Sequence, residues 1–211
     1  MKIAIIGASG NIGSRVMKEA LSRGHDVTGI SRNTSKITEK NSKLKLINCD
    51  IFNPSELVKH LENKDVVISA YAPAFENVGQ LVDATNTLIE VAKKAKVKHL
   101  IVVGGAGSLE VAHNALLLDS PQFPDAWRPI ARAHKEALHL YESEKSLKWS
   151  YAHPAAVIEP GSRTGKFRLG SNQLLVDVQG NSKISIEDFA IALLDEAETP
   201  KHIHKRFVVA Y

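Results

Sequence analysis

The sequence predicts a doubly wound α/β domain, and two features of its hydrophobic pattern carry that prediction. Short apolar runs alternate with longer amphipathic stretches along the chain. The apolar runs are continuous stretches of Val, Ile and Leu, which is typical of parallel strands buried on both faces. The repeated order of strand and helix then favours one parallel sheet with helices on both sides. The length of 211 residues suits a single domain, spanning residues 1–211.

Each apolar run is interpreted as a strand and each amphipathic stretch as a helix. The expected strands are Lys2–Ile6, Asp26–Ile30, Leu44–Asn48, Val66–Ala70, His99–Val103, Trp149–His153 and Phe207–Ala210. The expected helices are Asn11–Arg23, Pro54–Glu62, Val78–Ala95, Pro129–Ser146 and Ile186–Glu198. Gly24 is expected to end the first helix, and Asn53 followed by Pro54 to begin the second.

Two long segments interrupt this rhythm. Residues 104–128 follow the fifth strand without a clear pattern, and residues 158–185 contain EPGSRTGKFRLG and are expected to include a short hairpin. Long irregular segments on a regular scaffold often build a substrate site. Both are therefore expected on the substrate side, the second as a small extension near the C-terminus. Arg163 and Arg168 in this extension could meet an anionic substrate or face water.

The stretch IIGASGNIGSRV, residues 5 to 16, joins the first strand to the first helix and spaces its glycines three apart. In this setting Gly7 permits a tight turn, Gly10 lets the backbone approach a pyrophosphate, and Gly13 allows close packing of helix on strand. The amides at the helix start would hold the phosphates, and Ser9 and Asn11 could add side-chain donors. The motif therefore predicts a dinucleotide site on a Rossmann-type sheet; the alternative is a glycine-rich turn without a ligand.

The residues after the second strand favour NADP(H) over NAD(H). An NAD site usually places an acid there, whereas an NADP site uses an arginine near the 2′-phosphate. No acid occurs from Val27 to Thr38, and Arg32 lies just past the strand. The alternative is a solvated basic loop. After the third strand, Asp50 could accept from the adenine amino group and Ile51 could pack on the ring, although Asp50 could equally be a turn cap.

Tyr141 and Lys145 have the tyrosine–lysine spacing of short-chain dehydrogenases, but Lys145 falls at the predicted helix end, far from any nicotinamide. Lys135 is better placed on the same helix, yet Ala131 stands four residues before it where a tyrosine would be needed. The usual phenol acid is therefore absent. Lys135 and His153 remain candidates for a catalytic role, and His113 could also supply a proton; for the two histidines the alternative is a structural or solvated role.

Several motifs together resemble the atypical short-chain dehydrogenase/reductases with NAD(P)H-binding domains. They are GASGNIG, ISRN, CDIFNP, VVGGAGSLE, AHKEAL and EPGSRTGKFRLG followed by NSKISIEDFA. The bacterial NADH-flavin reductase-like proteins are the most similar group, and mammalian biliverdin-IXβ/flavin reductase is more distantly similar. The resemblance implies a Rossmann-type sheet, an NAD(P)H site and reductase activity on flavins or similar acceptors. By position it implies cofactor contacts from Gly7, Ser9, Asn11, Ile12, Arg32, Asp50, Ala70, Tyr71, Lys135 and Pro154.

The missing phenol acid narrows the choice of acceptor. Reduction of a ketone needs a proton donor for the developing alkoxide. Reduction of a free flavin or quinone needs less, because charge spreads over the ring and water can supply protons; the protein mainly stacks two planar systems. A flavin is thus expected as a substrate and not as a bound prosthetic group. The alternative is a non-enzymatic sensor that binds NADP(H) and reports its redox state to a partner.

Net charge, apolar run lengths and the cysteine and histidine positions indicate which kinds of partner the protein can bind. A net charge of +4 without a basic, aromatic-rich stripe argues against nucleic acid, and no apolar run is long enough to span a membrane. Cys49 is the only cysteine, which excludes an intrachain disulfide and favours a cytoplasmic location. His202 and His204 form an HxH without a nearby third ligand, so no metal is expected. The expected partner is a small-molecule electron acceptor, with the protein a monomer or homodimer.

Overall fold

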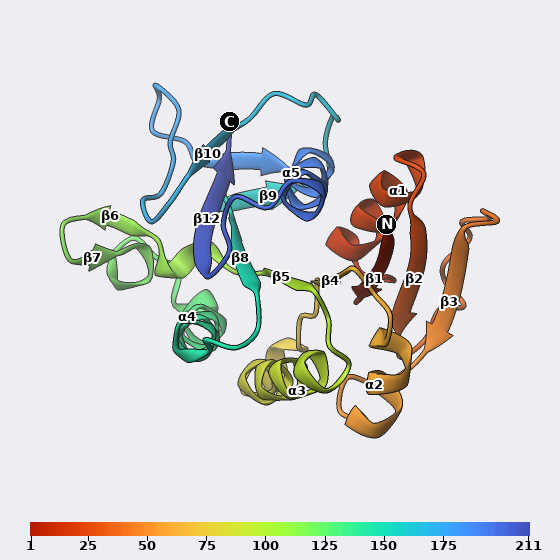
Figure 1. Cartoon of the computed structure of the whole chain (residues 1–211). Coiled ribbons are helices and arrows are strands. Elements are labelled where there is room, and N and C mark those ends of the chain that lie inside the picture. Colours follow the sequence, from red (N-terminus) through yellow and green to blue (C-terminus); the bar gives the residue numbers. More distant parts are fainter.

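An eight-stranded sheet runs through the centre of the protein, in the order β10-β12-β8-β5-β4-β1-β2-β3. The computed structural model describes residues 1–211 (Figure 1). The parallel strands are β1 (Lys2–Ile6), β2 (Asp26–Ser31), β3 (Leu44–Asn48), β4 (Val66–Ser69), β5 (His99–Val103), β8 (Trp149–Pro154) and β12 (Lys205–Ala210). Only β10 (Arg168–Gly170), at one edge, is antiparallel to its neighbour. The predicted α/β class and parallel sheet are confirmed.

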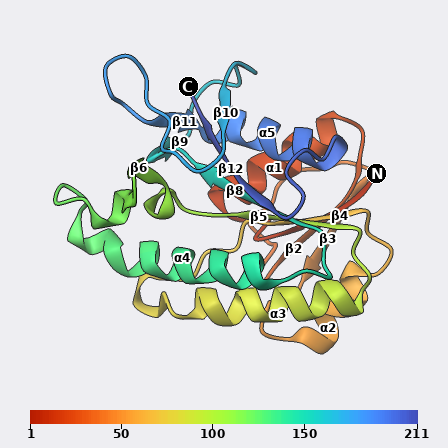
Figure 2. The ribbon, with the colours of Figure 1, turned by 60° about the vertical axis from the view of Figure 1, so that its left-hand side comes forward.

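Helices cover both faces of the sheet (Figure 2). One face carries α1 (Asn11–Ser22) and α5 (Ile186–Glu198), and the other carries α2 (Pro54–Leu61), α3 (Gln80–Lys94) and α4 (Arg128–Ser143). In β1, Ile3 and Ile5 join the core beneath α1 and α5, whereas Ala4 and Ile6 join the core beneath the other three helices. Successive side chains of a strand point to opposite faces, so this strand is buried on both sides, as its apolar run predicts.

The signals at the helix ends act as expected. Gly24 adopts φ +80 just after α1, and its N–H donates to the Leu21 carbonyl. The Asn53 side chain accepts from the Glu56 N–H at the start of α2. The fourth helix ends at Ser143 and not at Ser146, because the Glu144 carboxylate takes the N–H groups that a further turn would have used.

The 158–185 segment differs from the expected hairpin. Its first strand, β9 (Val157–Glu159), pairs in parallel with β11 (Lys183–Ser185), and β10 between them joins the main sheet against β12. The hairpin prediction was wrong because β10 covers the edge of β12 that a local hairpin would have left open. The only local hairpin in the irregular segments is β6 (Glu110–Ala112) with β7 (Ala115–Leu116).

Short 3₁₀ turns complete the connections: η1 (Phe75–Asn77), η2 (Ala106–Ser108), η3 (Leu117–Asp119) and η4 (Asp125–Trp127). The first of these ends at Asn77, and α3 begins at Gln80, two residues after the start predicted at Val78. No helix of the protein is both long and apolar enough to cross a membrane.

Candidate functional site

A cleft of about 370 Å³ opens where β1, β2, β3 and β4 end. The chain passes from β1 outward through β2 and β3 and then returns across β1 to β4, so the cleft lies where the strand order reverses, the usual binding position in such sheets. The lining residues are Ile6, Gly7, Ser9, Gly10, Ile30, Ser31, Arg32, Asn33, Lys36, Cys49, Asp50, Ile51, Phe52, Ala70, Tyr71 and Ala72.

The glycines form the turn between β1 and α1, where Gly7 and Gly13 leave no space for a side chain. Gly7 has φ +80, and a Cβ on it would lie 2.6 Å from the Ala70 carbonyl oxygen. A Cβ on Gly13 would lie 2.1 Å from the Gly7 carbonyl oxygen, so this glycine sets how closely α1 packs on the turn. Gly10 is different: it is exposed, and a Cβ there would meet only the Gly7 carbonyl oxygen, at 3.2 Å.

The start of α1 offers unpaired backbone donors. Its N-cap is Gly10, which has no side chain to cap the helix, and the first turn contains no acid. The Gly10 N–H donates to Gly7 (2.9 Å) and the Ser9 N–H to Ser31 Oγ (3.0 Å). The first-turn amides, those of Asn11, Ile12 and Gly13, have no partner within the helix. Together with the helix dipole they form an anion site beside the cleft.

Two cations stand at the end of β2. Arg32 and Lys36 line the cleft, and neither makes a hydrogen bond or ion pair within the protein. Asp50 is the only carboxylate of the lining, and its Oδ1 accepts from the Phe52 N–H at 3.1 Å. It therefore caps its own turn, one of the two roles open from the sequence. The arrangement leaves positive charge unmatched next to the anion site at α1.

An aromatic residue that the sequence analysis missed lies at the same place. Ile51 is only 4% exposed, whereas Phe52 is 41% exposed and packs edge-on against Tyr71 with ring centroids 6.1 Å apart. Burial raises the pKa of the Tyr71 hydroxyl, so the phenol stays neutral. Phe52 thus offers the accessible apolar surface that Ile51 was expected to supply. An exposed phenylalanine directly after a strand is the signal that could have identified it. Cys49, Ile6, Ile30 and Ala72 also line the cleft unexpectedly.

Lys135 and Pro154, which the resemblance implies as contacts, do not line this cleft. Lys135 is exposed on α4 and makes no ion pair, and Pro154 is buried at the end of β8. Tyr141 is fully buried, with ring centroids 5.9 Å from Trp149 and 5.8 Å from Tyr151, and burial raises the pKa of its hydroxyl. It is a core residue, which agrees with its rejection as a catalytic acid.

The environment of His153 favours a structural role. The side chain is fully buried, and Nδ1 lies 2.8 Å from the Gly105 carbonyl oxygen. Because a carbonyl only accepts, Nδ1 carries the proton, and Nε2 is left without a partner. Burial lowers the pKa of His153 to about 3, against a smaller opposite effect of the Gly105 bond. A neutral, enclosed imidazole is unsuited to donating protons, and its bond instead fixes the loop after β5.

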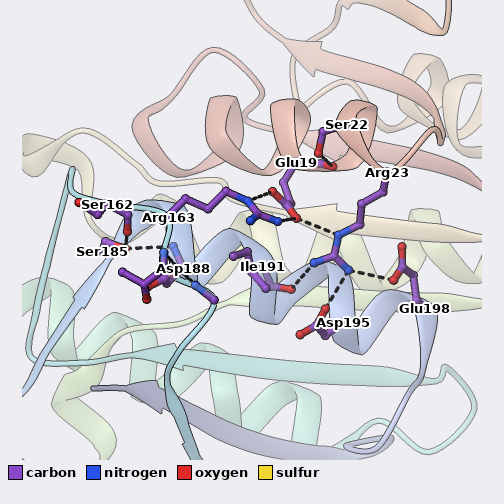
Figure 3. Close-up of polar contacts among 12 residues, drawn as sticks. Glu19, Ser22, Arg23, Ser162, Arg163, Ser185, Asp188, Ile191, Asp195 and Glu198 are labelled. Atoms are coloured by element: carbon purple, nitrogen blue, oxygen red, sulfur yellow. Dashed lines mark hydrogen bonds and ion pairs between the residues drawn. The ribbon is translucent and has the colours of Figure 1, made fainter.

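The conspicuous arginine of the extension is bound within the protein. Arg163 donates to both oxygens of Glu19, at 2.8 and 2.9 Å, and Arg23 donates to Glu19 from the other side at 2.9 Å (Figure 3). The hydrogen bonds from Arg163, opposed by burial and joined by those from Arg23, lower the pKa of Glu19. Arg23 also bonds Asp195 and Glu198, which links α1 to α5. The Arg163 guanidinium thus has its charge partner, Glu19, within the protein.

Arg168 is also engaged, since its guanidinium donates to the backbone carbonyls of Val176 and Tyr211. The two irregular segments are joined to each other as well. The Glu110 N–H donates to Asn172 and the Leu174 N–H donates back to Glu110, both at 2.9 Å. Residues 104–128 and 158–185 are therefore hydrogen-bonded to each other, and His113 lies exposed in the first of them.

A sequence model of the family described as NAD(P)H-binding matches residues 7–200. The chain belongs to this NAD(P)H-binding family. The match begins at the first glycine of the turn and extends through α5. The ligand class of this family is a nicotinamide dinucleotide, and its fold is oxidoreductase-like.

Full-length relatives agree with this family. The uncharacterized protein YwnB of Bacillus subtilis is 41% identical over 99% of this chain and 98% of its own. The crystal structure of a candidate exported protein from Burkholderia pseudomallei has a TM-score of 0.91 at 44% identity, with both chains fully covered. The structure of a candidate NADH-flavin reductase from Streptococcus pneumoniae has a TM-score of 0.88 at 32% identity, covering 100% of this chain and 99% of that one. The resemblance to NADH-flavin reductase-like proteins is thus confirmed.

Proposed function

We propose that the protein is a reductase that transfers hydride from NADPH to a planar, delocalised acceptor such as a free flavin or a quinone. The unpaired Arg32 at the dinucleotide cleft, with no carboxylate at the end of β2, is the observation that carries the choice of cofactor. The similarity to a candidate NADH-flavin reductase supports the reaction class.

The cleft suits the phosphorylated end of NADPH. A guanidinium donates two parallel hydrogen bonds to a phosphate, and Lys36 adds a second positive charge in the same lining. The pyrophosphate would lie on the first-turn amides of α1, where Gly10 leaves the approach open. A ribose 2′-hydroxyl, by contrast, would find no carboxylate at the end of β2.

Neither Tyr141 nor His153 is placed to donate a proton, which supports the delocalised acceptor. Tyr141 is in the core, and His153 is enclosed and neutral. The chain's own residues would therefore bind and orient two planar groups, while water supplies protons to the reduced acceptor. The same lack of an acid is compatible with a sensor, so turnover itself must be measured.

Anaerobic mixing of the protein with NADPH and an excess of FMN, FAD or a soluble quinone separates the two functions. The reductase proposal expects multiple turnovers, seen as loss of NADPH absorbance, with at least one of these acceptors. Binding of NADPH without oxidation by any of them would contradict the reductase and favour the sensor.

Replacement of Arg32 by alanine tests the cofactor. A charge-assisted hydrogen bond contributes about 1.5–3 kcal/mol, so Arg32→Ala should weaken NADPH binding by roughly ten- to a hundredfold and leave NADH nearly unchanged. Titration calorimetry measures both affinities. Lys40→Ala removes an exposed charge from the same loop but outside the cleft, and serves as the matched control. Equal affinity of the wild type for NADPH and NADH would contradict the proposal.

Turnover measurements test which lysine of α4 and its C-terminal flank acts in the reaction, Lys135 or the Lys145 that follows Tyr141. Lys135→Ala should lower kcat/KM by about ten- to a hundredfold, because we propose that its ammonium holds the cofactor by one charged hydrogen bond. Tyr141→Phe and Lys145→Ala should leave turnover almost unchanged, because Tyr141 is buried in the core and Lys145 lies past the end of α4. A strong loss in Tyr141→Phe with an unchanged circular dichroism spectrum would show that the wrong lysine was chosen.

A further inference from the structure

Three side chains with metal-binding atoms meet on the side of the sheet covered by α2. They are the Cys49 thiol, the Glu56 carboxylate and the His60 imidazole, and their ligand atoms all lie within 4.8 Å of one another. Cys49 follows β3 directly, and Glu56 and His60 lie four residues apart on α2, so both helix residues share one face. The expectation of no metal considered only the HxH of His202 and His204 and did not foresee this cluster.

The three side chains make no hydrogen bonds to one another. His60 Nε2 is closed off from solvent and has no hydrogen-bond partner. Its nearest acid oxygen, Glu56 Oε1, lies 3.8 Å away, which is too far for a hydrogen bond. The Cys49 side chain is only 5% exposed, and its one polar contact is the Asp50 carbonyl oxygen at 3.5 Å. An unpaired buried nitrogen beside a buried thiol and a carboxylate is the arrangement expected of an empty ligand set.

A second contact orients the carboxylate. Asn53 Nδ2 donates to Glu56 Oε2 at 2.9 Å, so this oxygen is held by the helix cap while Oε1 faces His60. Metal-binding carboxylates are commonly fixed by such outer hydrogen bonds. The cap that begins α2 therefore also positions a ligand atom.

We propose that Cys49, Glu56 and His60 bind a Zn²⁺ ion. Sulfur, imidazole nitrogen and carboxylate oxygen are its common ligands, and a hard cation such as Mg²⁺ would avoid the thiolate. The fourth tetrahedral position is open to a water molecule, because Glu56 and His60 are partly exposed. Binding transfers the thiol proton to solvent, and the thiolate pairs with the ion. Cys49 also lines the dinucleotide cleft, so the ion would lie directly behind the cleft wall.

Cobalt provides the direct test, because a thiolate ligand gives Co²⁺ a charge-transfer band in the near ultraviolet. The full-length protein, without nucleotide, is freed of metal with a chelator, kept reduced and titrated with Co²⁺. We expect the band to saturate at a single equivalent per chain and to disappear when Zn²⁺ displaces the cobalt. Absence of a saturable band, together with no Zn²⁺ binding by calorimetry, would overturn the proposal.

Variants assign the ligands. Cys49→Ser should remove the charge-transfer band, and His60→Gln and Glu56→Gln should weaken Zn²⁺ binding by about tenfold or more, since even outer partners of a metal site are worth that much. His60→Gln changes a partly exposed side chain, so it remains informative if Cys49→Ser does not fold. His139→Gln disrupts an exposed histidine–glutamate pair on α4 and should change nothing. Unchanged Zn²⁺ binding in His60→Gln would contradict the assignment, and NADPH binding plays no part in either result.

Discussion

Gly10→Val should abolish the thermal stabilisation that NADPH gives to the wild-type protein. Gly10 is exposed at the N-cap of α1, and its missing side chain leaves the first-turn amides open to a phosphate. In the proposed binding mode, a valine would place carbon atoms where the phosphate oxygens would lie. At about one hundred times its Kd, a ligand stabilises the folded state by about 2.7 kcal/mol, or roughly 5–10 °C in Tm for a domain of this size. The variant should show none of this shift.

The unliganded Gly10→Val protein should still fold. The new Cβ would meet only the Gly7 carbonyl oxygen, at 3.2 Å, and the backbone conformation of Gly10 (φ −81, ψ 172) is one that valine readily adopts. Melting curves with and without NADPH therefore separate loss of binding from loss of fold. A full NADPH-dependent shift in Gly10→Val would mean that the glycine turn does not approach a phosphate, and the reductase proposal would lose its basis.

Two other glycines give the comparison its controls. Gly79 also lies at a helix N-cap, that of α3, and a Cβ there meets nothing, so Gly79→Val should keep the NADPH shift. Gly13→Val should instead destabilise the unliganded protein, because its Cβ would lie 2.1 Å from the Gly7 carbonyl oxygen. The loss should be on the order of 3 kcal/mol or more, at the upper end of what overpacked sites cost.

Features set by neighbours along the chain could be predicted from the sequence. The strand of residues 2–6, the glycine turn and the cap at Asn53 each depend on residues a few positions apart, and all three occur where expected. The cleft could be predicted as well, because the local signals locate the strands and a parallel sheet brings the carboxyl ends of these strands together at one edge.

Features that depend on distant partners could not be predicted. Arg163 looked free because Glu19, which neutralises it, lies 144 residues earlier in the chain. The β9–β11 pair and the addition of β10 to β12 also join separated segments. Likewise, Cys49 meets Glu56 and His60 only when α2 packs under the end of β3. The spacing of apolar residues shows which face of an element is buried, but it does not show which distant charged residue or edge strand that element will contact.

Asp188→Ala should be the single substitution that most weakens the attachment of the C-terminal extension, residues 158–185, to α5. Asp188 is fully buried in the first turn of α5 and accepts hydrogen bonds from the Thr164 and Gly165 N–H groups, both at 2.8 Å, and from Tyr211 Oη at 2.9 Å. Alanine would leave these donors without a partner. The free energy of unfolding should fall by on the order of 3 kcal/mol, since a hydrogen bond to a charged group contributes about 1.5–3 kcal/mol and water replaces part of the loss. This corresponds to a Tm lowered by roughly 6–12 °C.

The effect should depend on pH in one direction. Burial by itself raises the pKa of Asp188, but the hydrogen bonds from Thr164, Gly165 and Tyr211 outweigh it and leave the pKa below its usual value. A carboxylate with a lowered folded-state pKa stabilises the fold fully above its unfolded pKa, about 3.9, and loses that contribution as the pH falls through the folded value. The difference between wild type and Asp188→Ala should therefore be constant at neutral pH and shrink below about pH 4.

A second carboxylate on the same helix provides the control. Asp195 is 55% exposed and bonded only to Arg23, so Asp195→Ala should cost about 1 kcal/mol at most. Asp188 binds the backbone of residues 164 and 165, next to Arg163. Asp188→Ala should therefore increase the rate at which trypsin cuts after Arg163, whereas Asp195→Ala should leave this rate unchanged. If Asp188→Ala has the same Tm as the wild type and resists trypsin equally, Asp188 does not anchor the extension, which is then held by its other contacts, among them Arg163 with Glu19 and β10 with β12.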